Sequence, residues 1–185
     1  MEDRIAIALL KQGKLNGLET LVNRYQAKAV HTAYLITQER ASAEDAAQSA
    51  FVKIAERIHQ FDETRPFPPW FFRIVVHDAL KLAKRMKRHA SLDELDEDAS
   101  ALSALLVDSA PQPEPTLEAK QARENILQAI QRLPPEQRAV IAMRYYLDMS
   151  EADMSAKMDR PLSSIKWWLR DARKRLSELI ADDRR

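Results

Sequence analysis

The chain has no cysteine and only 2 glycines in 185 residues. The missing cysteine excludes disulfides, thiolate zinc sites and a cysteine nucleophile. A β-rich fold of this length would normally need many more glycine-containing turns. Apolar residues make up 45% of the chain and charged residues 31%, enough to bury a core beneath a polar surface. We therefore expect an all-α protein of one medium domain or two small ones.

Long apolar runs are lacking near the start of the chain. The longest early run, residues 5–10, has six residues and follows the acidic Glu2 and Asp3. It is too short for the apolar core of a signal peptide or for a membrane span. We expect a cytoplasmic protein that does not insert into a membrane.

Signals of catalysis and of metal binding are also poor. The sequence has no glycine-rich phosphate loop and no nucleophile elbow. Glu56 and His59 have the Glu-x-x-His spacing of di-iron bundles, but such sites need a second copy, which is missing. His31 and His89 have no accompanying ligand residues. We expect no enzyme activity, no bound metal and no cofactor.

The net charge is only +1, but basic and acidic residues are concentrated in different segments of the chain. Residues 65–89 carry 7 basic and 1 acidic residue, and residues 160–175 carry 6 basic and 1 acidic. Between them, residues 90–118 carry 8 acidic residues and no basic one. Two basic segments on either side of an acidic one suggest a polyanion that is contacted at two places. The alternative is that each block is simply solvated surface.

The patterning divides the chain into two helical parts. Residues 1–89 read as packed helices, with one helix from Ser42, a proline-containing loop over 61–69 and a long helix over 70–89. Residues 90–115 are rich in Ser, Asp, Glu and Pro and read as a flexible acidic linker. Fully extended, these 26 residues span at most roughly 90 Å. Residues 116–185 form the second helical part, with a break at Pro134 and Pro135.

The segment 61–88 combines aromatic and basic residues. One stripe of its long helix is apolar, and the stripe on the opposite side is basic. Aromatic stacking together with a cationic groove is how proteins hold unpaired bases. The alternative is that the aromatics form a core, and at least two of the five should do so. The basic stripe is Arg73, His77, Lys81, Lys84 and Arg88, and the aromatics are Phe61, Phe67, Trp70, Phe71 and Phe72.

The second part has the layout of a helix-turn-helix. A capping-box-like start at Ser150 precedes a short helix, a break at residues 159–161 and a final helix. Trp167 on its outward face would contact DNA or else a neighbouring helix, whereas Trp168 borders the core. The inward face is Leu162, Ile165, Leu169, Ala172, Leu176 and Leu179, and the outward face is Ser163, Lys166, Trp167, Arg170, Arg173 and Lys174.

Three segments together resemble the bacterial sigma factors of the extracytoplasmic-function group. Residues 43–51 (AEDAAQSAF) resemble the family's helix that binds core RNA polymerase. Residues 61–88 resemble its segment for −10 recognition and promoter melting. Residues 133–176 resemble its −35-binding domain. The three lie in the family's order and span nearly the whole chain.

The resemblance implies a sigma factor that directs promoter-specific initiation without catalysis of its own. Its partners would be core polymerase, promoter DNA (−35 duplex and −10 single strand) and an anti-sigma factor. The acidic linker would enter a basic polymerase channel or act as a passive tether. The implied core-binding residues are Asp45, Gln48 and Phe51. The implied −10 residues are Phe61, Arg65, Phe67, Trp70, Arg73, His77, Lys81, Lys84 and Arg88. The implied −35 residues are Ser163, Ser164, Lys166, Trp167, Arg170, Arg173 and Lys174.

Departures from the family pattern fall where bases would be read. His77 stands where the family usually has Asn, and Trp167, Trp168 and Asp171 stand where it has small or basic residues. A carboxylate such as that of Asp171 can accept a hydrogen bond from a cytosine amino group. We therefore expect an altered promoter sequence on an unchanged architecture.

Two other functions fit the same patterns. A DNA-binding repressor or activator would act without polymerase, but it would normally dimerise on paired half-sites, and no dimerisation helix is evident. A helical adaptor would bind only protein. Co-elution with core polymerase and initiation at a promoter would separate a sigma factor from both.

Overall fold

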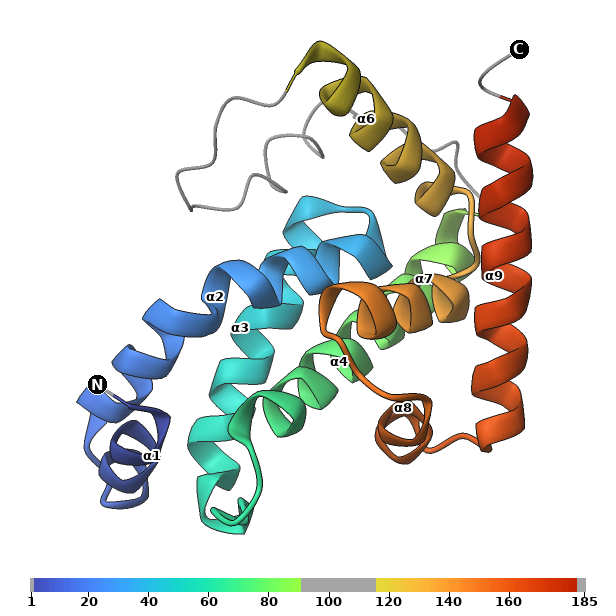
Figure 1. Cartoon of the computed structure of the whole chain (residues 1–185). Coiled ribbons are helices and arrows are strands. Elements are labelled where there is room, and N and C mark those ends of the chain that lie inside the picture. Colours follow the sequence, from blue (N-terminus) through green and yellow to red (C-terminus); the bar gives the residue numbers. More distant parts are fainter. Residues whose placement is uncertain (1, 91–115, 183–185) are drawn as a thin grey trace.

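The computed structural model describes residues 2–90 and 116–182, which form helices and the turns that join them (Figure 1). No strand occurs in these two ranges, which confirms the all-α prediction. The predicted linker, except Ala90, lies outside the described residues. The first range contains α1 (Asp3–Lys11), α2 (Leu15–Thr37), α3 (Arg40–Arg57), a 3-10 turn (Ile58–Gln60) and α4 (Phe67–Ala90). The second contains α6 (Leu117–Gln131), α7 (Pro135–Ile141), a π-helical turn (Ala142–Tyr146), α8 (Glu151–Met158) and α9 (Leu162–Asp182).

The N-terminal unit, α1 to α4, is built on three long helices that lie side by side (Figure 1). Its core combines apolar residues of α2 and α3 with the apolar stripe of α4, including the fully buried Leu21, Ile54 and Phe71. Helix α1 crosses α2 at Gly17. A Cβ atom there would lie 2.3 Å from the carbonyl oxygen of Ala6, so the crossing requires glycine.

Two helices of this unit begin earlier than the sequence predicts. Helix α3 starts at Arg40, before Ser42, because the Glu39 side chain accepts a hydrogen bond from the Ser42 backbone N–H at 2.9 Å. Helix α4 starts at Phe67 because Pro68 and Pro69 fit its first turn, where backbone N–H groups have no intrahelical partner. The loop before α4 is accordingly shorter than predicted.

The C-terminal unit, α6 to α9, contains the predicted helix-turn-helix. The Ser150 side chain accepts from the Asp153 backbone N–H at 3.1 Å, which confirms the predicted cap of α8. Asp159 ends α8 in the left-handed conformation, with φ 51°. Helix α9 buries Ile165 and Leu169 as predicted. Of the other residues predicted to face inward, Ala172 is buried, Leu176 and Leu179 are half-buried, and Leu162, the first residue of α9, is 39% exposed.

The two units are packed against each other. Helix α7 and the π-helical turn lie against α2 and α4 (Figure 1). The Lys28 ammonium on α2 lies 5.8 Å from the ring centroid of Phe72 and 5.5 Å from that of Tyr146, so a cation–π pair spans the junction. The charge pattern and the linker length gave no sign of this packing.

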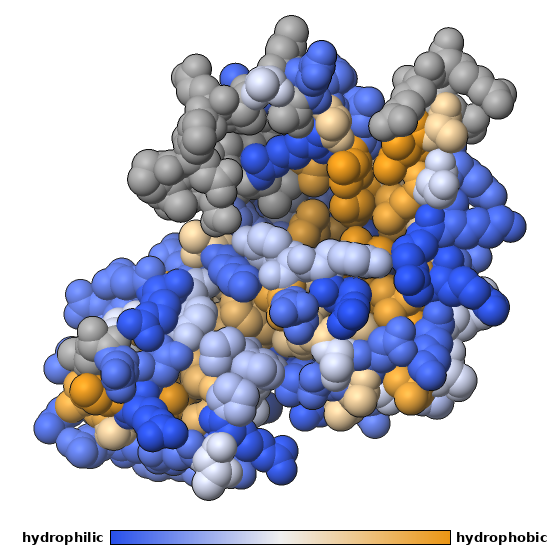
Figure 2. Space-filling view, in the orientation of Figure 1, coloured by the Kyte–Doolittle hydropathy of each residue, from blue (hydrophilic) through white to orange (hydrophobic). Residues whose placement is uncertain are grey.

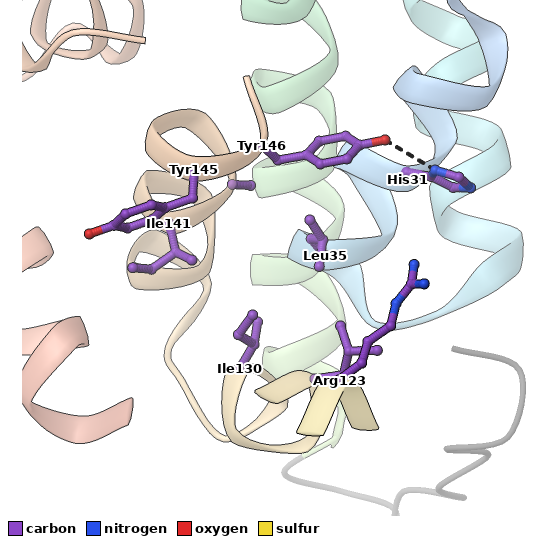
Figure 3. A pocket seen from close by; sticks show the side chains of 9 residues that line it. His31, Leu35, Arg123, Ile130, Ile141, Tyr145 and Tyr146 are labelled. Atoms are coloured by element: carbon purple, nitrogen blue, oxygen red, sulfur yellow. Dashed lines mark hydrogen bonds between the residues drawn. The ribbon is translucent and has the colours of Figure 1, made fainter. Parts of the chain in front are cut away.

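A cavity of about 310 Å³ opens at the same junction, between α2, α6 and the π-helical turn (Figure 3). The phenol oxygen of Tyr146 lies 3.1 Å from Nδ1 of His31 at its edge. Hydrophobic surface also remains open between α6 and α9 (Figure 2). The cavity lining is mostly apolar and includes Leu35, Leu127, Ile130, Ile141 and Tyr145.

Candidate nucleic-acid and protein interfaces

The first candidate surface lies on α3. Asp45 and Gln48 are exposed, as a protein contact requires. Phe51 is not: it is 7% exposed, and its ring packs against that of Phe71 with centroids 4.8 Å apart. Phe51 therefore supports the helix from beneath and does not offer a docking contact in this structure.

Val52 was missed by the sequence analysis and belongs to this surface. It is 53% exposed, and seven residues from Asp45 it points in nearly the same direction, whereas Phe51 lies about 120° around the helix. The spacing of Asp45, Gln48 and Val52, three and then four residues, was available in the sequence. These three residues are called the α3 surface below.

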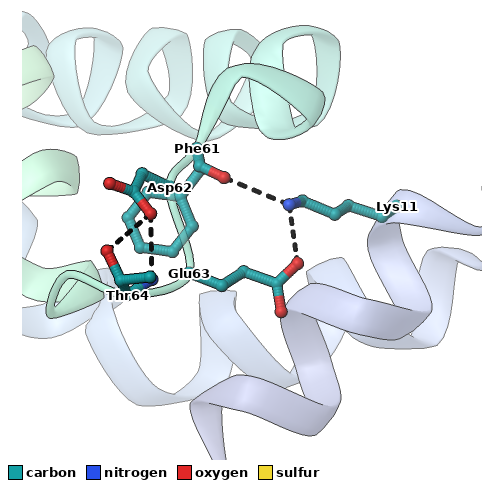
Figure 4. Close-up of polar contacts among 5 residues, drawn as sticks. All are labelled: Lys11, Phe61, Asp62, Glu63 and Thr64. Atoms are coloured by element: carbon teal, nitrogen blue, oxygen red, sulfur yellow. Dashed lines mark hydrogen bonds and ion pairs between the residues drawn. The ribbon is translucent and has the colours of Figure 1, made fainter.

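The loop that precedes α4 is fixed by a contact from α1 and by hydrogen bonds within the loop itself (Figure 4). The Lys11 ammonium donates to the carbonyl oxygen of Phe61 at 3.1 Å and pairs with Glu63 at 2.6 Å. Oδ1 of Asp62 accepts from the hydroxyl and the backbone N–H of Thr64 at 2.7 and 3.0 Å. These two hydrogen bonds lower the pKa of the exposed Asp62. The loop is thus a defined turn.

Two of the aromatic residues expected to stack on bases are instead in the core. Phe61 is 5% exposed and Phe67 3%, and their ring centroids are 5.6 Å apart. Neither ring can stack on a base while the two are packed in this way. The expected stacking role of both residues therefore does not fit this structure. Trp70 is half-buried at the edge of the cluster, 5.1 Å from the Phe61 ring. The expectation that at least two of five aromatics are core is confirmed, since Phe71 and Phe72 are buried as well.

The predicted basic stripe is present on the solvent side of α4. Its described members Arg73, His77, Lys81 and Lys84 are all exposed, as is Arg65 in the preceding loop. Arg88 lies within α4, but its side chain is outside the described residues. The apolar stripe on the other side of α4 is buried against α2 and α3. This division of one helix between a core and a cationic face is the arrangement needed to bind a nucleic acid backbone.

The second cationic face lies on α9. Its outward residues Ser163, Lys166, Trp167, Arg170, Arg173 and Lys174 are exposed, and Ser164 is half-buried. Nε of Arg173 donates to the Leu169 carbonyl of its own helix at 3.1 Å. The face begins at the tight turn after α8, which Ser155 fixes by donating to the Arg160 carbonyl at 2.6 Å.

The two tryptophans of α9 differ as the sequence suggests. Trp167 is 50% exposed among the basic residues, whereas Trp168 is half-buried and packs against the core. A large aromatic side chain on a cationic face marks a contact surface. Its ring can pack against deoxyribose or a thymine methyl group.

Asp171 is engaged inside the protein. Its Oδ2 accepts from the Gln137 amide of α7 at 2.6 Å and from Nε of Arg175 at 2.9 Å. The carboxylate thereby ties α9 to α7. The expectation that it accepts a hydrogen bond from cytosine does not fit this geometry, because both bonds would compete with the base.

In residues 2–90 and 116–182, no three His, Cys, Asp or Glu residues gather as metal ligands would. No helix there is long and apolar enough to cross a membrane.

Comparison with known families gives two matches in the order of the candidate surfaces. Residues 21–89 match the model of sigma-70 region 2, and residues 123–176 match that of sigma-70 region 4. The first range contains the α3 surface and the basic stripe of α4. The second contains the helix-turn-helix with the cationic face of α9.

Individual proteins are similar along nearly the whole chain. The ECF RNA polymerase sigma factor SigW of Bacillus subtilis is 25% identical over 95% of both chains. The ECF sigma-E factor of Escherichia coli is 24% identical over 90% of this chain and 87% of its own. Among solved structures, CnrH, in complex with the cytosolic domain of CnrY, covers 98% of both chains with a TM-score of 0.67 and 22% identity. The sigma factor RpoE of Bartonella quintana, in complex with the anti-sigma factor NepR, has a TM-score of 0.62 and 18% identity, covering 88% of this chain and 96% of its own. These structural likenesses establish the fold.

A region 2 and a region 4 on one helical chain define a sigma factor, and this chain belongs to the sigma-70 family. Within the family it is a member of the extracytoplasmic-function group. It is therefore an alternative RNA polymerase sigma factor that directs transcription initiation.

Proposed function

We propose that the α3 surface is the part of this sigma factor that docks on core RNA polymerase. The exposed carboxylate of Asp45, the amide of Gln48 and the apolar Val52 form one continuous face. Such a mixture of polar groups around an apolar contact is typical of protein interfaces. Phe51 contributes by holding α3 on α4.

The basic stripe of α4 holds the unpaired −10 strand. Arg73, His77, Lys81 and Lys84 follow the helix and provide cations along the path of a phosphate backbone. Trp70 is the aromatic residue of the segment that retains exposed area for a base. Melting then follows from tighter binding of the open strand than of the duplex, which shifts the population of the two DNA states.

The face of α9 reads the −35 duplex. A recognition helix of a helix-turn-helix lies in the major groove, with its N-terminal residues at the base edges. Ser163, Ser164, Lys166 and Trp167 occupy that part of α9, and Arg170, Arg173 and Lys174 follow toward the phosphates. The observation that carries this assignment is the exposure of Trp167 beside Lys166 on an otherwise polar face.

The domain boundaries of this proposal are residues 1–89, 90–115 and 116–185. The first domain docks on polymerase and captures the −10 strand, and the third reads the −35 element. The middle segment has many acidic residues and no basic ones, so it is repelled by phosphates and cannot add to DNA binding. Its proposed role is to connect the domains, with entry into a basic polymerase channel as the alternative.

An anti-sigma factor is the proposed inhibitory partner. The similar RpoE structure contains the anti-sigma factor NepR. In this chain, the apolar cavity at the junction and the open hydrophobic surface between α6 and α9 would accept side chains of a partner helix (Figures 2 and 3). We place the protein in the cytoplasm, where polymerase and DNA are present, and assign it no catalytic step.

The function is tested by reconstitution. Purified chain is mixed with core polymerase, run on gel filtration and assayed for transcription from a library of promoters with randomised −35 and −10 elements. Co-elution and chain-dependent transcripts are expected. A chain that binds duplex DNA but neither co-elutes nor initiates would be a regulator that acts without polymerase.

A further inference from the structure

The loop that precedes α4 is contacted by a side chain from outside the matched region 2 (Figure 4). Lys11 is the last residue of α1, whereas the match to sigma-70 region 2 begins at residue 21. The Lys11 ammonium donates to the main-chain carbonyl of Phe61 at 3.1 Å and to the Glu63 carboxylate at 2.6 Å. One cation therefore holds the loop at two positions, 50 and 52 residues away along the chain.

Lys11 can act on the loop because α1 is itself fixed on α2. Gly17 of α2 allows the two helices to cross closely. At the other end of α1, the Asp3 carboxylate pairs with Arg24 of α2. The ammonium is thus presented from a packed helix. The residues that α1 buries are Ala6, Ile7 and Leu10.

The other contacts that shape the loop are exposed to water. Residues 62–66 are all exposed, so burial of their side chains does not fix them. The Asp62 side chain accepts from the Thr64 backbone N–H at 3.0 Å, and the Asp62 carbonyl accepts from the Arg65 backbone N–H at 3.1 Å. Such hydrogen bonds contribute little against competing water, so on their own they would let the turn open locally. The Lys11 contacts oppose that opening from outside the loop.

Lys11 also balances a charge that would repel DNA. The loop has two carboxylates, Asp62 and Glu63, and one cation, Arg65. Nε of Arg65 lies 3.4 Å from the Asp62 carboxylate, which leaves Glu63 to Lys11. With Lys11 the four side chains carry no net charge. Without it, one negative charge would face an approaching phosphate backbone.

We propose that Lys11 is a positioning residue for recognition of the −10 strand, because it holds residues 62–65 in the turn against which the bases are placed. The inference rests on the proposed function, in which this segment captures the strand. The Lys11 side chain is 24% exposed and directed at the loop, so it acts through the shape of the loop. It keeps Arg65 in one place ahead of the basic stripe of α4. Loss of Lys11 should therefore weaken the choice between bases more than the binding of phosphates.

The turn is tested in the free chain by hydrogen exchange of the Thr64 and Arg65 amides, measured by NMR. Lys11→Met keeps the length of the side chain but removes the ammonium, and both amides should exchange at least about threefold faster. Lys11→Arg keeps the charge and the donors and should restore slow exchange. Lys14→Met, at an exposed lysine three residues further along, is the control and should leave exchange unchanged.

The consequence for DNA is tested in holoenzyme with two single-stranded probes. One is the −10 strand that the unsubstituted holoenzyme selects from a randomised library, and the other has abasic sites in place of its bases. Lys11→Met with Glu63→Gln leaves the net charge unchanged, so repulsion cannot explain a loss. The control, Lys14→Met with Glu19→Gln, makes the same changes at two exposed positions.

The Lys11 double variant should bind the strand with bases at least about threefold more weakly than the control, because fewer of its loops are competent to bind. The two variants should bind the abasic strand equally. Lys11→Arg and Glu63→Gln alone, which still allow the contact, should bind both probes like the unsubstituted chain. Circular dichroism should be the same for all variants.

Unchanged amide exchange in Lys11→Met would overturn the inference, as would equal affinity of the two double variants for the strand with bases. Equal losses on both probes would also overturn it, because they would show a general effect on DNA binding. Failure of the proposed function is distinct: the unsubstituted holoenzyme would then select no −10 sequence at all, and the inference would fall with it.

Discussion

The guanidinium of Arg138 donates to the main-chain carbonyl of Ile36, 102 residues away, at 2.9 Å. Both partners are buried, and the pKa of Arg138 is lowered by burial to about 10, so the side chain remains charged at neutral pH. One buried cation therefore donates hydrogen bonds both to a carbonyl near the end of α2 and to the carbonyl of Leu133 after α6. Carbonyls at helix ends need such donors because they have no partner within their helix.

Replacing Arg138 should cost stability. Arg138→Met keeps much of the side-chain stem but leaves buried carbonyls without donors, and we expect the free energy of unfolding to fall by about 1–3 kcal/mol. Chemical denaturation followed by circular dichroism measures it. Arg160→Met, at an exposed position, is the control and should change it by less than about 0.5 kcal/mol. Equal stability of the two variants would show that the buried bonds contribute nothing.

Substitutions at the neighbouring residues Phe51 and Val52 should affect different properties, the first the stability of the fold and the second the binding of core polymerase. Phe51→Ala removes a packed ring and should destabilise the fold by about 3–5 kcal/mol. Val52→Asp should leave stability within about 0.5 kcal/mol but weaken binding to core polymerase, as should Asp45→Ala with Gln48→Ala. Anisotropy titration with labelled protein gives the affinities. Undiminished binding by Val52→Asp and by the double variant would remove the α3 surface from the interface.

Lys81 provides a clean test of the stripe, because its side chain is exposed and makes no hydrogen bond or ion pair with any other part of residues 2–90 and 116–182. In holoenzyme, Lys81→Gln should weaken binding of the −10 single strand for every sequence. The slope of log affinity against log salt should become shallower by about 0.7, which corresponds to one lost phosphate contact. Lys120→Gln, exposed on α6, should leave the slope as it is. An unchanged slope for Lys81→Gln would place the strand elsewhere.

The two tryptophans of α9 should separate DNA binding from stability. Trp167→Ala should weaken binding to the −35 duplex while leaving the free energy of unfolding within about 0.5 kcal/mol. Trp168→Ala should lower that free energy by more than about 1 kcal/mol, because its ring packs on the core. Thermal unfolding and duplex titration measure both quantities. Destabilisation of several kcal/mol by Trp167→Ala would make it a core residue.

Composition and periodicity predicted much of this fold. Two glycines in 185 residues and apolar residues at helical spacing indicate helices, and Ser150 marked the start of α8 through an interaction three residues away. Such signals are local, so the sequence displays them. The resemblance to the family further predicted the order of the candidate surfaces along the chain: core binding, then −10 binding, then −35 binding.

The remaining features depend on contacts between distant segments. Arg138 reads as an ordinary charge on a short helix, and its acceptors are backbone carbonyls, which leave no trace in side-chain patterns. Asp171 looked free to meet a base until α7 placed Gln137 beside it. Phe51 was assigned from the motif, whereas helix geometry alone pointed to Val52.

We expect α4 and α9 to read two different promoter elements. Both preferences are measured in one experiment by sequencing the transcripts that the unsubstituted chain, His77→Ala and Lys166→Ala produce from the randomised promoter library. Lys166→Ala should relax the preference in the −35 window only, by about 1–3 kcal/mol at one base pair if Lys166 binds a guanine. His77→Ala should alter the preference in the −10 window only. If all three proteins select the same −35 sequence and the same −10 sequence, neither His77 nor Lys166 reads a base, and the assignment of α4 and α9 is wrong.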